Sequence, residues 1–188
     1  MYCFEFSNHC TCFVFQDNNH IIFGRNSDFL VELEKLYMNC LYRLDNVYAF
    51  NGNTAAFVQM EDGVNEYGLA VGLTFVYPKV RKYGFNAGML VRYILEKCQT
   101  TQEALSFLKS VPIASQQTIT IIDALKDMAV VECNPYVVEV ILPKENEQYV
   151  VTANNYTSLK LEEYKQKNID ILDLSLIHIS EPTRLQLI

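Results

Sequence analysis

Cys10-Thr11-Cys12-Phe13-Val14-Phe15-Gln16-Asp17-Asn18-Asn19-His20-Ile21-Ile22-Phe23-Gly24-Arg25-Asn26-Ser27-Asp28-Phe29 is the stretch that decides the fold of this chain. It contains two short runs of β-branched and aromatic residues, Thr11 to Phe15 and His20 to Phe23, which are typical of strands. Between them, Asp17-Asn18-Asn19 supplies residue types that favour a tight turn. The stretch therefore predicts an antiparallel β-hairpin.

The predicted hairpin brings reactive side chains together at one end. If the turn centres on its two asparagines, Cys10 lies opposite Ser27. In the same register, Cys12 lies opposite Arg25. A slip of one or two residues still leaves Cys10 beside the segment 24–28. A thiol, a guanidinium and a carboxylate are then held by a rigid element, which positions catalytic groups better than a loop does.

The order Cys-Thr-x, a short hairpin and then Gly-Arg-Asn-x-Asp resembles the choloylglycine hydrolase and acyltransferase branch of the N-terminal-nucleophile (Ntn) hydrolases. That branch includes bile-salt hydrolases, penicillin V acylases, acid-ceramidase-like amidases and isopenicillin-N-type acyltransferases. The resemblance implies that Cys10 is the first residue of the mature chain, with its thiolate as nucleophile and its α-amino group as general base. It also implies that Arg25 lies beside the sulfur and that Asp28 holds the amino group.

Two further segments carry the same resemblance. Residues 62–75 contain Asn-Glu-Tyr-Gly-Leu and are similar to the family's Asn-Glu-x-Gly-Leu segment. Residues 151–156 are similar to its oxyanion-hole asparagine segment, with Asn154 as the better match and Asn155 as the neighbouring alternative. Bile-salt hydrolases have an asparagine at the position of Thr74, so a backbone N–H there is expected to serve the oxyanion hole. The same difference points towards an amide or acyl substrate other than a bile salt.

The chemistry of these residues agrees with the implied roles. An α-amino group titrates near pH ~8, so much of it is a free base at neutral pH. A free cysteine has a pKa of about 8.5, which a nearby arginine lowers. Histidine is scarce, because His9, His20 and His178 are the only three. A papain-like Cys/His pair therefore has poor candidates.

We expect a cysteine Ntn hydrolase that cleaves or transacylates a linear carbon–nitrogen amide bond, with no metal or organic cofactor. A cut between His9 and Cys10 would free the nucleophile. The alternative is a catalytically inactive fragment or binding module that keeps the fold. A zinc site built from Cys3, His9, Cys10 and Cys12 is a third interpretation, although its spacing matches no familiar zinc pattern.

Each of these residues also has an ordinary structural explanation. Cys10 and Cys12 share one face of a strand and could be core thiols. Arg25 and Asp28 could form a surface ion pair of little energetic worth. Asn154 could lie in an unremarkable loop. Their joint order and spacing, rather than any single residue, favour the catalytic interpretation.

Composition limits the classes of partner. The 188 residues are 50% hydrophobic and carry a net charge of −7 with no cluster of Lys and Arg, which disfavours nucleic acid. No apolar run approaches the ~20 residues of a membrane span, and the start lacks a signal-peptide pattern. The six cysteines show no disulfide-like framework, so a reducing cytoplasm is expected. The expected partner is a small-molecule amide rather than nucleic acid or a membrane, and a homo-oligomer is compatible with the sequence.

The rest of the chain alternates strand and helix signals. Asn51-Gly52-Asn53 is predicted to form a turn. Two amphipathic helices are predicted, one over 86–98 with Asn86 as its cap and one that opens on a Thr100–Glu103 capping box. A short polar helix is expected at 159–167. Strands are predicted at 37–44, 47–50, 54–60, 68–77, 118–122, 129–133, 137–142 and 149–153.

The order strands, helices, strands fits an α+β fold, and the resemblance implies the four-layer αββα Ntn sandwich. Residues 175–188 resemble a translated read-through of a sequencing adaptor, while family members continue well past the segment of Asn154. We therefore expect a leader at 1–9, a partial Ntn domain at 10–174 that lacks its C-terminal half, and a non-native tail at 175–188. Missing strands would leave open sheet edges and exposed apolar faces.

Overall fold

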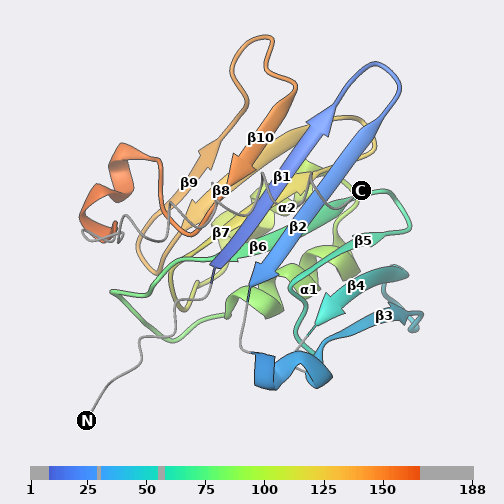
Figure 1. Ribbon diagram of the computed structural model, residues 1–188, viewed down its shortest axis with the longest axis horizontal. Coiled ribbons are helices and arrows are strands. Elements are labelled where there is room, and N and C mark those ends of the chain that lie inside the picture. The colour runs from blue at the N-terminus through green and yellow to red at the C-terminus, as the bar shows by residue number, and fades with distance from the viewer. Residues whose placement is uncertain (1–8, 29–30, 55–57, 166–188) are drawn as a thin grey trace, which may run out of the picture.

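A computed structural model describes residues 9–28, 31–54 and 58–165 of the chain (Figure 1). Its strands form two antiparallel sheets, and it also has two α-helices and two short 3₁₀ helices. The elements in chain order are β1 (His9–Gln16), β2 (Ile21–Asp28), η1 (Val31–Leu36), β3 (Met38–Tyr42), β4 (Phe50–Thr54), β5 (Asp62–Asn65), β6 (Ala70–Phe75), α1 (Ala87–Lys97), α2 (Thr101–Ser110), β7 (Gln117–Ile122), β8 (Met128–Cys133), β9 (Val138–Ile141), β10 (Tyr149–Thr152) and η2 (Leu159–Tyr164).

The predicted hairpin is confirmed, with its register. In the pairing of β1 with β2, Cys10 lies opposite Ser27 and Cys12 lies opposite Arg25. The turn is held by Asp17, whose Oδ1 accepts hydrogen bonds from the two backbone N–H groups of residues 19 and 20. These bonds also lower the pKa of the Asp17 carboxyl below its ordinary value. Strand β10 pairs with the other edge of β1 and completes a three-stranded sheet in the order β10-β1-β2.

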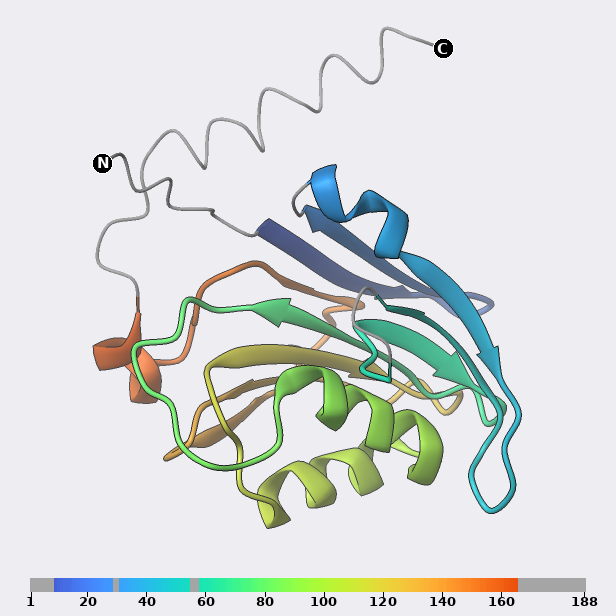
Figure 2. The same ribbon diagram turned by 90° about the horizontal axis from the view of Figure 1, so that it is seen from below.

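The larger sheet has seven strands in the order β3-β4-β5-β6-β7-β8-β9. Helices α1 and α2 lie together on one of its faces, and the β1–β2 hairpin lies on the other (Figure 2). Both helices begin where the sequence predicted. The side chain of Asn86 accepts from the backbone N of Met89, and that of Thr100 accepts from the backbone N of Glu103.

Two apolar clusters separate these layers. The larger one fills the space between the helices and the seven-stranded sheet, and it contains Leu90, Ile94 and Leu108 together with Val71 and Val131 from the strands. A smaller one lies between the sheets. The α+β class is therefore confirmed, as a helix layer on two packed sheets. The second helix layer expected in a four-layer sandwich is not among the described residues.

Three predicted elements are wrong in type. Of the predicted strand 47–50, only Phe50 lies in a strand. Asn51-Gly52-Asn53 lies inside strand β4 rather than in a turn, and residues 58–60 of the predicted strand 54–60 are not in a strand. Residues 55–57 of that strand lie outside the described residues, as do most of the predicted leader and the whole of the predicted tail. The helix expected at 159–167 is the 3₁₀ helix η2. Within the described ranges, no helix is both long and apolar enough to cross a membrane.

Candidate active site

Cys10 lies near the start of β1 on the face that packs against the seven-stranded sheet. Alternate residues of a strand share a face, and Cys10, Cys12 and Val14 are accordingly all buried. The side chain of Cys10 borders a cavity of about 310 Å³. The other residues that line this cavity are Arg25, Ser27, Tyr37, Thr54, Gln59, Met60, Glu61, Leu73, Phe75, Asn86, Ala87, Gly88 and Ser115.

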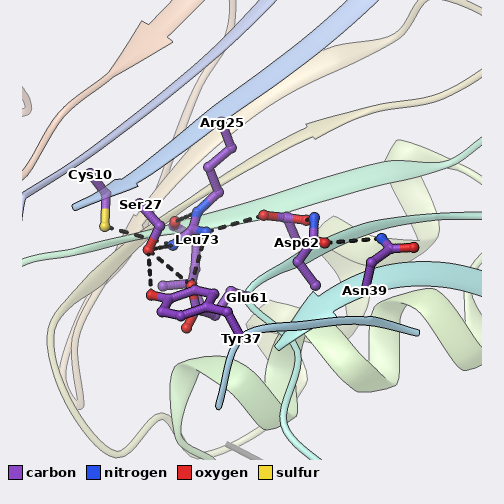
Figure 3. Close-up of polar contacts among 9 residues, drawn as sticks. Cys10, Arg25, Ser27, Tyr37, Asn39, Glu61, Asp62 and Leu73 are labelled. Atoms are coloured by element: carbon purple, nitrogen blue, oxygen red, sulfur yellow. Dashed lines mark hydrogen bonds and ion pairs between the residues drawn. The ribbon is translucent and has the colours of Figure 1, made fainter. Parts of the chain in front are cut away.

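Arg25 extends from β2 to the sulfur of Cys10 and to the seven-stranded sheet (Figure 3). Its Nη2 donates to Cys10 Sγ at 3.6 Å, and its Nε donates to the carbonyl oxygen of Leu73 at 2.7 Å. Its Nη1 pairs with Glu61 Oε2 at 3.0 Å and with Asp62 Oδ2 at 3.1 Å. Burial alone would lower the pKa of Arg25, but Cys10 and the two carboxylates outweigh it and raise that pKa. The guanidinium therefore stays charged beside the thiol.

Further polar groups fix the two carboxylates. The hydroxyl of Ser27 donates to Glu61 Oε2 at 3.1 Å and lies 3.0 Å from the hydroxyl of Tyr37. Asn53 Nδ2 donates to Asp62 Oδ1 at 2.6 Å. Burial raises the pKa of Tyr37, so its hydroxyl stays protonated at neutral pH. The Arg25 side chain is thus held on several sides before any substrate arrives.

Asn154, two residues after the end of β10, contacts Cys10. Its Oδ1 accepts from the backbone nitrogen of Cys10 at 2.5 Å, and its Nδ2 donates to the carbonyl oxygen of Phe75 at 2.6 Å. The neighbouring Asn155 instead accepts from the backbone nitrogen of Tyr156. Of the two asparagines named from the sequence, Asn154 is therefore the one at the site.

Neither of the other two predicted residues makes a described contact with the sulfur of Cys10. Asp28 is exposed and opposite His9, and its carboxylate accepts from Asn26 Nδ2 at 2.8 Å. Among the described contacts, the nitrogen of Cys10 bonds to Asn154 rather than to Asp28. Thr74 is fully buried, and its hydroxyl bonds to that of Thr118 and lies 3.4 Å from the carbonyl oxygen of residue 153.

The second thiol of the hairpin, that of Cys12, lies in the core. Burial raises the pKa of Cys12 to about 12, and the nearby Arg25 only partly offsets that effect. Cys12 is therefore a protonated core thiol near neutral pH, not a nucleophile. Within the described residues, no three His, Cys, Asp or Glu side chains gather where they could hold a metal ion. Cys3, part of the zinc interpretation, lies outside them.

Sequence reasoning did not identify Glu61, Asp62, Ser27 and Tyr37 as members of the site. A signal for the first two existed, because a buried arginine needs acidic partners, Asp62 is the first residue of the second family-like segment and Glu61 directly precedes it. The hairpin register placed Ser27 opposite Cys10 but gave it no role, and no spacing rule pointed to Tyr37. The contacts of Ser27 with Glu61 and Tyr37 depend on how β2 packs against the segment before β3.

Comparison with known proteins gives the family and the fold. The family described as acyl-coenzyme A:6-aminopenicillanic acid acyl-transferase matches residues 14–179. No curated protein sequence matches the chain significantly. A similar solved structure is the Caenorhabditis elegans ortholog of N-acylethanolamine-hydrolyzing acid amidase, with a TM-score of 0.65 and 20% identity over 86% of this chain and 82% of that one.

Two bacterial structures have the same fold. Penicillin V acylase from Agrobacterium tumefaciens gives a TM-score of 0.55 at 20% identity, and a mutant conjugated bile acid hydrolase from Clostridium perfringens gives 0.53 at 17%. Each match covers 82% of this chain but only 56% and 57% of the respective bacterial chains. The resemblance seen in the sequence is therefore confirmed: this chain belongs to the acyl-coenzyme A:6-aminopenicillanic acid acyl-transferase family and has the fold of the choloylglycine-hydrolase-like Ntn hydrolases.

Proposed function

We propose that the chain is the catalytic part of a cysteine Ntn hydrolase that cleaves, or transacylates, a linear carbon–nitrogen amide bond. The family match and the fold support an enzyme of the amide hydrolase or acyltransferase kind. The observation that carries the proposal is the environment of Cys10. Its sulfur accepts from Arg25 and its nitrogen donates to Asn154, and Cys10 and Arg25 border the same cavity.

Activation requires that Cys10 become the first residue. In the proposed step, Cys10 Sγ adds to the carbonyl carbon of His9 and the Cys10 nitrogen leaves that carbon as an amine. Water then hydrolyses the resulting thioester. The products are a peptide that ends in the His9 carboxylate and a chain that begins with a free Cys10 amine. No cofactor takes part, and the nucleophile and base then belong to one residue.

Turnover uses the same groups. The Cys10 amine accepts the thiol proton, and the thiolate adds to the amide carbonyl of the substrate. The protonated amine then gives its proton to the departing substrate nitrogen, which leaves a thioester on the sulfur. Water, or an acceptor amine, releases the acyl group with the Cys10 amine as base. Arg25 stabilises the thiolate electrostatically.

Asn154 is the proposed donor to the oxyanion. Its Nδ2 carries two protons, and only one is needed for the carbonyl oxygen of Phe75. The other can be donated to the tetrahedral oxyanion, an interaction typically worth about 3–4 kcal/mol when one donor is removed. The hydroxyl of Thr74 is already bonded, so any contribution from this residue would come from its backbone N–H.

The proposed role of Asp28 is to hold the charged amine once residues 1–9 have left. Asp28 stands opposite His9 at the end of β2, one residue from the new terminus. A free ammonium at residue 10 would be a stronger partner for a carboxylate than the present peptide N–H. Asn154 would share that task through its Oδ1.

The test uses two cysteine variants and a set of N-acyl amides that includes a bile-salt conjugate, penicillin V and an N-acylethanolamine. We expect release of free amine by the unsubstituted chain, no release by Cys10→Ala, and release by Cys12→Ala. Release that survives Cys10→Ala would refute the assignment. A folded chain that cleaves none of these amides and leaves Cys10 unmodified by an amide-mimic electrophile would support the alternative, an inactive fragment or binding module.

A further inference from the structure

A row of polar side chains crosses the seven-stranded sheet beneath the segment that carries Asn154. In the strand registers, Thr74 of β6 pairs with Thr118 of β7, Thr118 pairs with Glu132 of β8, and Glu132 pairs with Glu139 of β9. Residues that are directly opposite in neighbouring strands point to the same face of a sheet. The hydroxyl of Thr74 contacts residue 153, so this face is the one that supports the chain after β10.

Glu132 is the centre of this support. Its Oε1 accepts from the backbone N of Thr157 at 2.6 Å and from the hydroxyl of Thr157 at 2.7 Å, and its Oε2 accepts from the backbone N of Ser158 at 2.9 Å. One residue before this clamp, the Tyr156 hydroxyl donates to the carbonyl oxygen of Cys133 at 2.6 Å. Two residues of strand β8 therefore bind three consecutive residues of the segment, 156, 157 and 158.

The burial of Glu132 makes the clamp unusual. The residue is only 1% exposed, and a buried carboxylate is costly unless several donors satisfy it. Here three donors come from two adjacent residues, which is the arrangement expected where backbone position must be fixed. The next acid in the row, Glu139, contrasts with it: its partner is the Lys160 side chain, which is 69% exposed.

The segment held by Glu132 is the one that places Asn154. Asn154 lies two residues after β10, between two fixed points: the β10 strand before it and the clamp at 157–158 after it. Its amide in turn bridges the nitrogen of Cys10 and the carbonyl oxygen of Phe75. If the clamp opens, the backbone after Asn154 loses its anchor at residues 157 and 158 and keeps only the bond of the Tyr156 hydroxyl to Cys133. We expect the Asn154 amide then to shift relative to Cys10.

We propose that Glu132 is a positioning residue for the active site, which acts through residues 157 and 158 to hold the Asn154 amide against Cys10. The proposal rests on the proposed function for its catalytic meaning, but the positioning itself is a property of the folded chain. It differs from a helix-capping role, because the 3₁₀ helix η2 is already capped by Ser158 Oγ, which accepts from the backbone N of Lys160.

The test measures the hydrogen bond from residue 10 to Asn154 directly. In a Cys10→Ala background the nitrogen of residue 10 remains a peptide amide, and its hydrogen exchange can be followed by NMR. Glu132→Gln replaces one accepting oxygen with an NH₂ group that faces a backbone N–H. We expect the exchange protection of the residue 10 amide to fall about tenfold or more, the size associated with losing a hydrogen bond to a charged group.

Two variants make the test specific. Glu139→Gln changes the neighbouring acid of the same row and should leave residue 10 unchanged. Thr157→Val removes only the hydroxyl donor and keeps both backbone donors, so it should lower protection less than Glu132→Gln. Thr157→Val also decides the question if Glu132→Gln fails to fold, because an unchanged residue 10 amide in this variant would then overturn the proposal.

Three results would overturn the proposal. The first is unchanged residue 10 protection in a folded Glu132→Gln chain. The second is an equal fall in Glu139→Gln. The third is a fall at residue 10 that is matched by the core amides of Ile119 and Val131, since that pattern reports general destabilisation.

Kinetics in the unsubstituted Cys10 chain separate this proposal from the proposed function. Glu132→Gln should lower kcat with little change in KM, because the Asn154 donor matters most to the transition state. If the chain hydrolyses no amide, the proposed function fails, and the exchange experiment still decides whether Glu132 positions Asn154.

Discussion

Arg25 contacts both the acidic side chains of the site and the thiol of Cys10. It is the only cation that contacts Glu61 and Asp62 among the described ion pairs, and its own side chain is 4% exposed. Its planar fork bonds to both carboxylates, to a backbone carbonyl and to sulfur at once, which a lysine could not reproduce. The arrangement couples the stability of the fold to the electrostatics of the thiol.

Replacing Arg25 with Met should therefore destabilise the protein strongly. Two partly buried carboxylates would lose their counter-charge, and breaking such a buried pair costs about 3–5 kcal/mol. Urea denaturation gives the free energy of unfolding. Lys160→Met is the control, because it breaks an exposed ion pair with Glu139 and should cost less than about 1 kcal/mol. Similar losses for the two variants would contradict this account of Arg25.

The two cysteines of β1 should differ in reactivity. Because the pKa of Cys12 is raised to about 12, its thiolate fraction at pH 8 is on the order of 10⁻⁴ and grows tenfold with each pH unit up to that pKa. Iodoacetamide at pH 8, followed by peptide mass spectrometry, should modify Cys10 and spare Cys12. Modification of Cys12 should rise steeply between pH 8 and pH 11. Preferential labelling of Cys12 at pH 8 would show that the assignment of the two thiols is reversed.

At the scale of elements, the sequence predicted the turns and helix starts that depend on hydrogen bonds between residues close in the chain. The β1–β2 register followed from Asp17 and the two asparagines of the turn, and both helix starts followed from Asn86 and Thr100. The Asn-Gly-Asn run at 51–53 gave a wrong turn prediction, because these residues serve contacts between neighbouring strands rather than a local turn. Asn51 and Asn53 bond across strands to Asn39, and a Cβ at Gly52 would lie 2.6 Å from the carbonyl oxygen of Asp62.

The site was predictable in part for the same reason. Cys10 and Arg25 lie on one hairpin, so their proximity could be worked out from the turn. Asn154 lies just beyond a strand that is distant from the hairpin in sequence, and only the family resemblance pointed to it. Glu61 and Asp62 meet Arg25 through the packing of one sheet on another, which periodicity does not encode.

The contact between the two sheets depends on Gly72 of β6. A Cβ there would lie 2.8 Å from Phe23 Cζ, 3.2 Å from Arg25 Cδ and 3.3 Å from Cys12 Sγ. Gly72→Ala should therefore cost about 1–3 kcal/mol through overpacking and should displace Arg25. Calorimetry and the Cys10 alkylation rate measure the two effects.

Gly24→Ala is the matched control for Gly72→Ala. Its Cβ would approach the ring of Phe13, which is 41% exposed and free to turn aside. The control should lose less than about 1 kcal/mol, as expected where the neighbour can move. If it proved as damaging as Gly72→Ala, close approach of the sheets at Gly72 would not be what requires the glycine.

At the scale of the whole molecule, the outer face of the three-stranded sheet is apolar, and no element of the described ranges 9–28, 31–54 and 58–165 covers it. The register places its large exposed side chains together on the side away from the seven-stranded sheet. These are Phe13, Phe15, Ile22, Tyr149 and Val151, each between 38% and 57% exposed. A contiguous apolar surface of this kind favours association.

We expect the chain to self-associate through this face at micromolar concentration. Sedimentation velocity should show species larger than the monomer, and the double variant Phe15→Lys/Val151→Lys should shift the distribution to monomer. A control substitution at Leu125, which is exposed on the β7–β8 turn, should leave the distribution of species unchanged. Unchanged sedimentation of the double variant would mean that the face is not the contact surface.

The central claim, that Cys10 acts as an N-terminal nucleophile, is tested most directly by the intact mass and N-terminal sequence of the freshly purified chain. The account predicts loss of residues 1–9 and a chain that begins at Cys10, with no such loss in Cys10→Ala. Retention of residues 1–9 by the folded, unsubstituted chain, or their loss from Cys10→Ala as well, would contradict it.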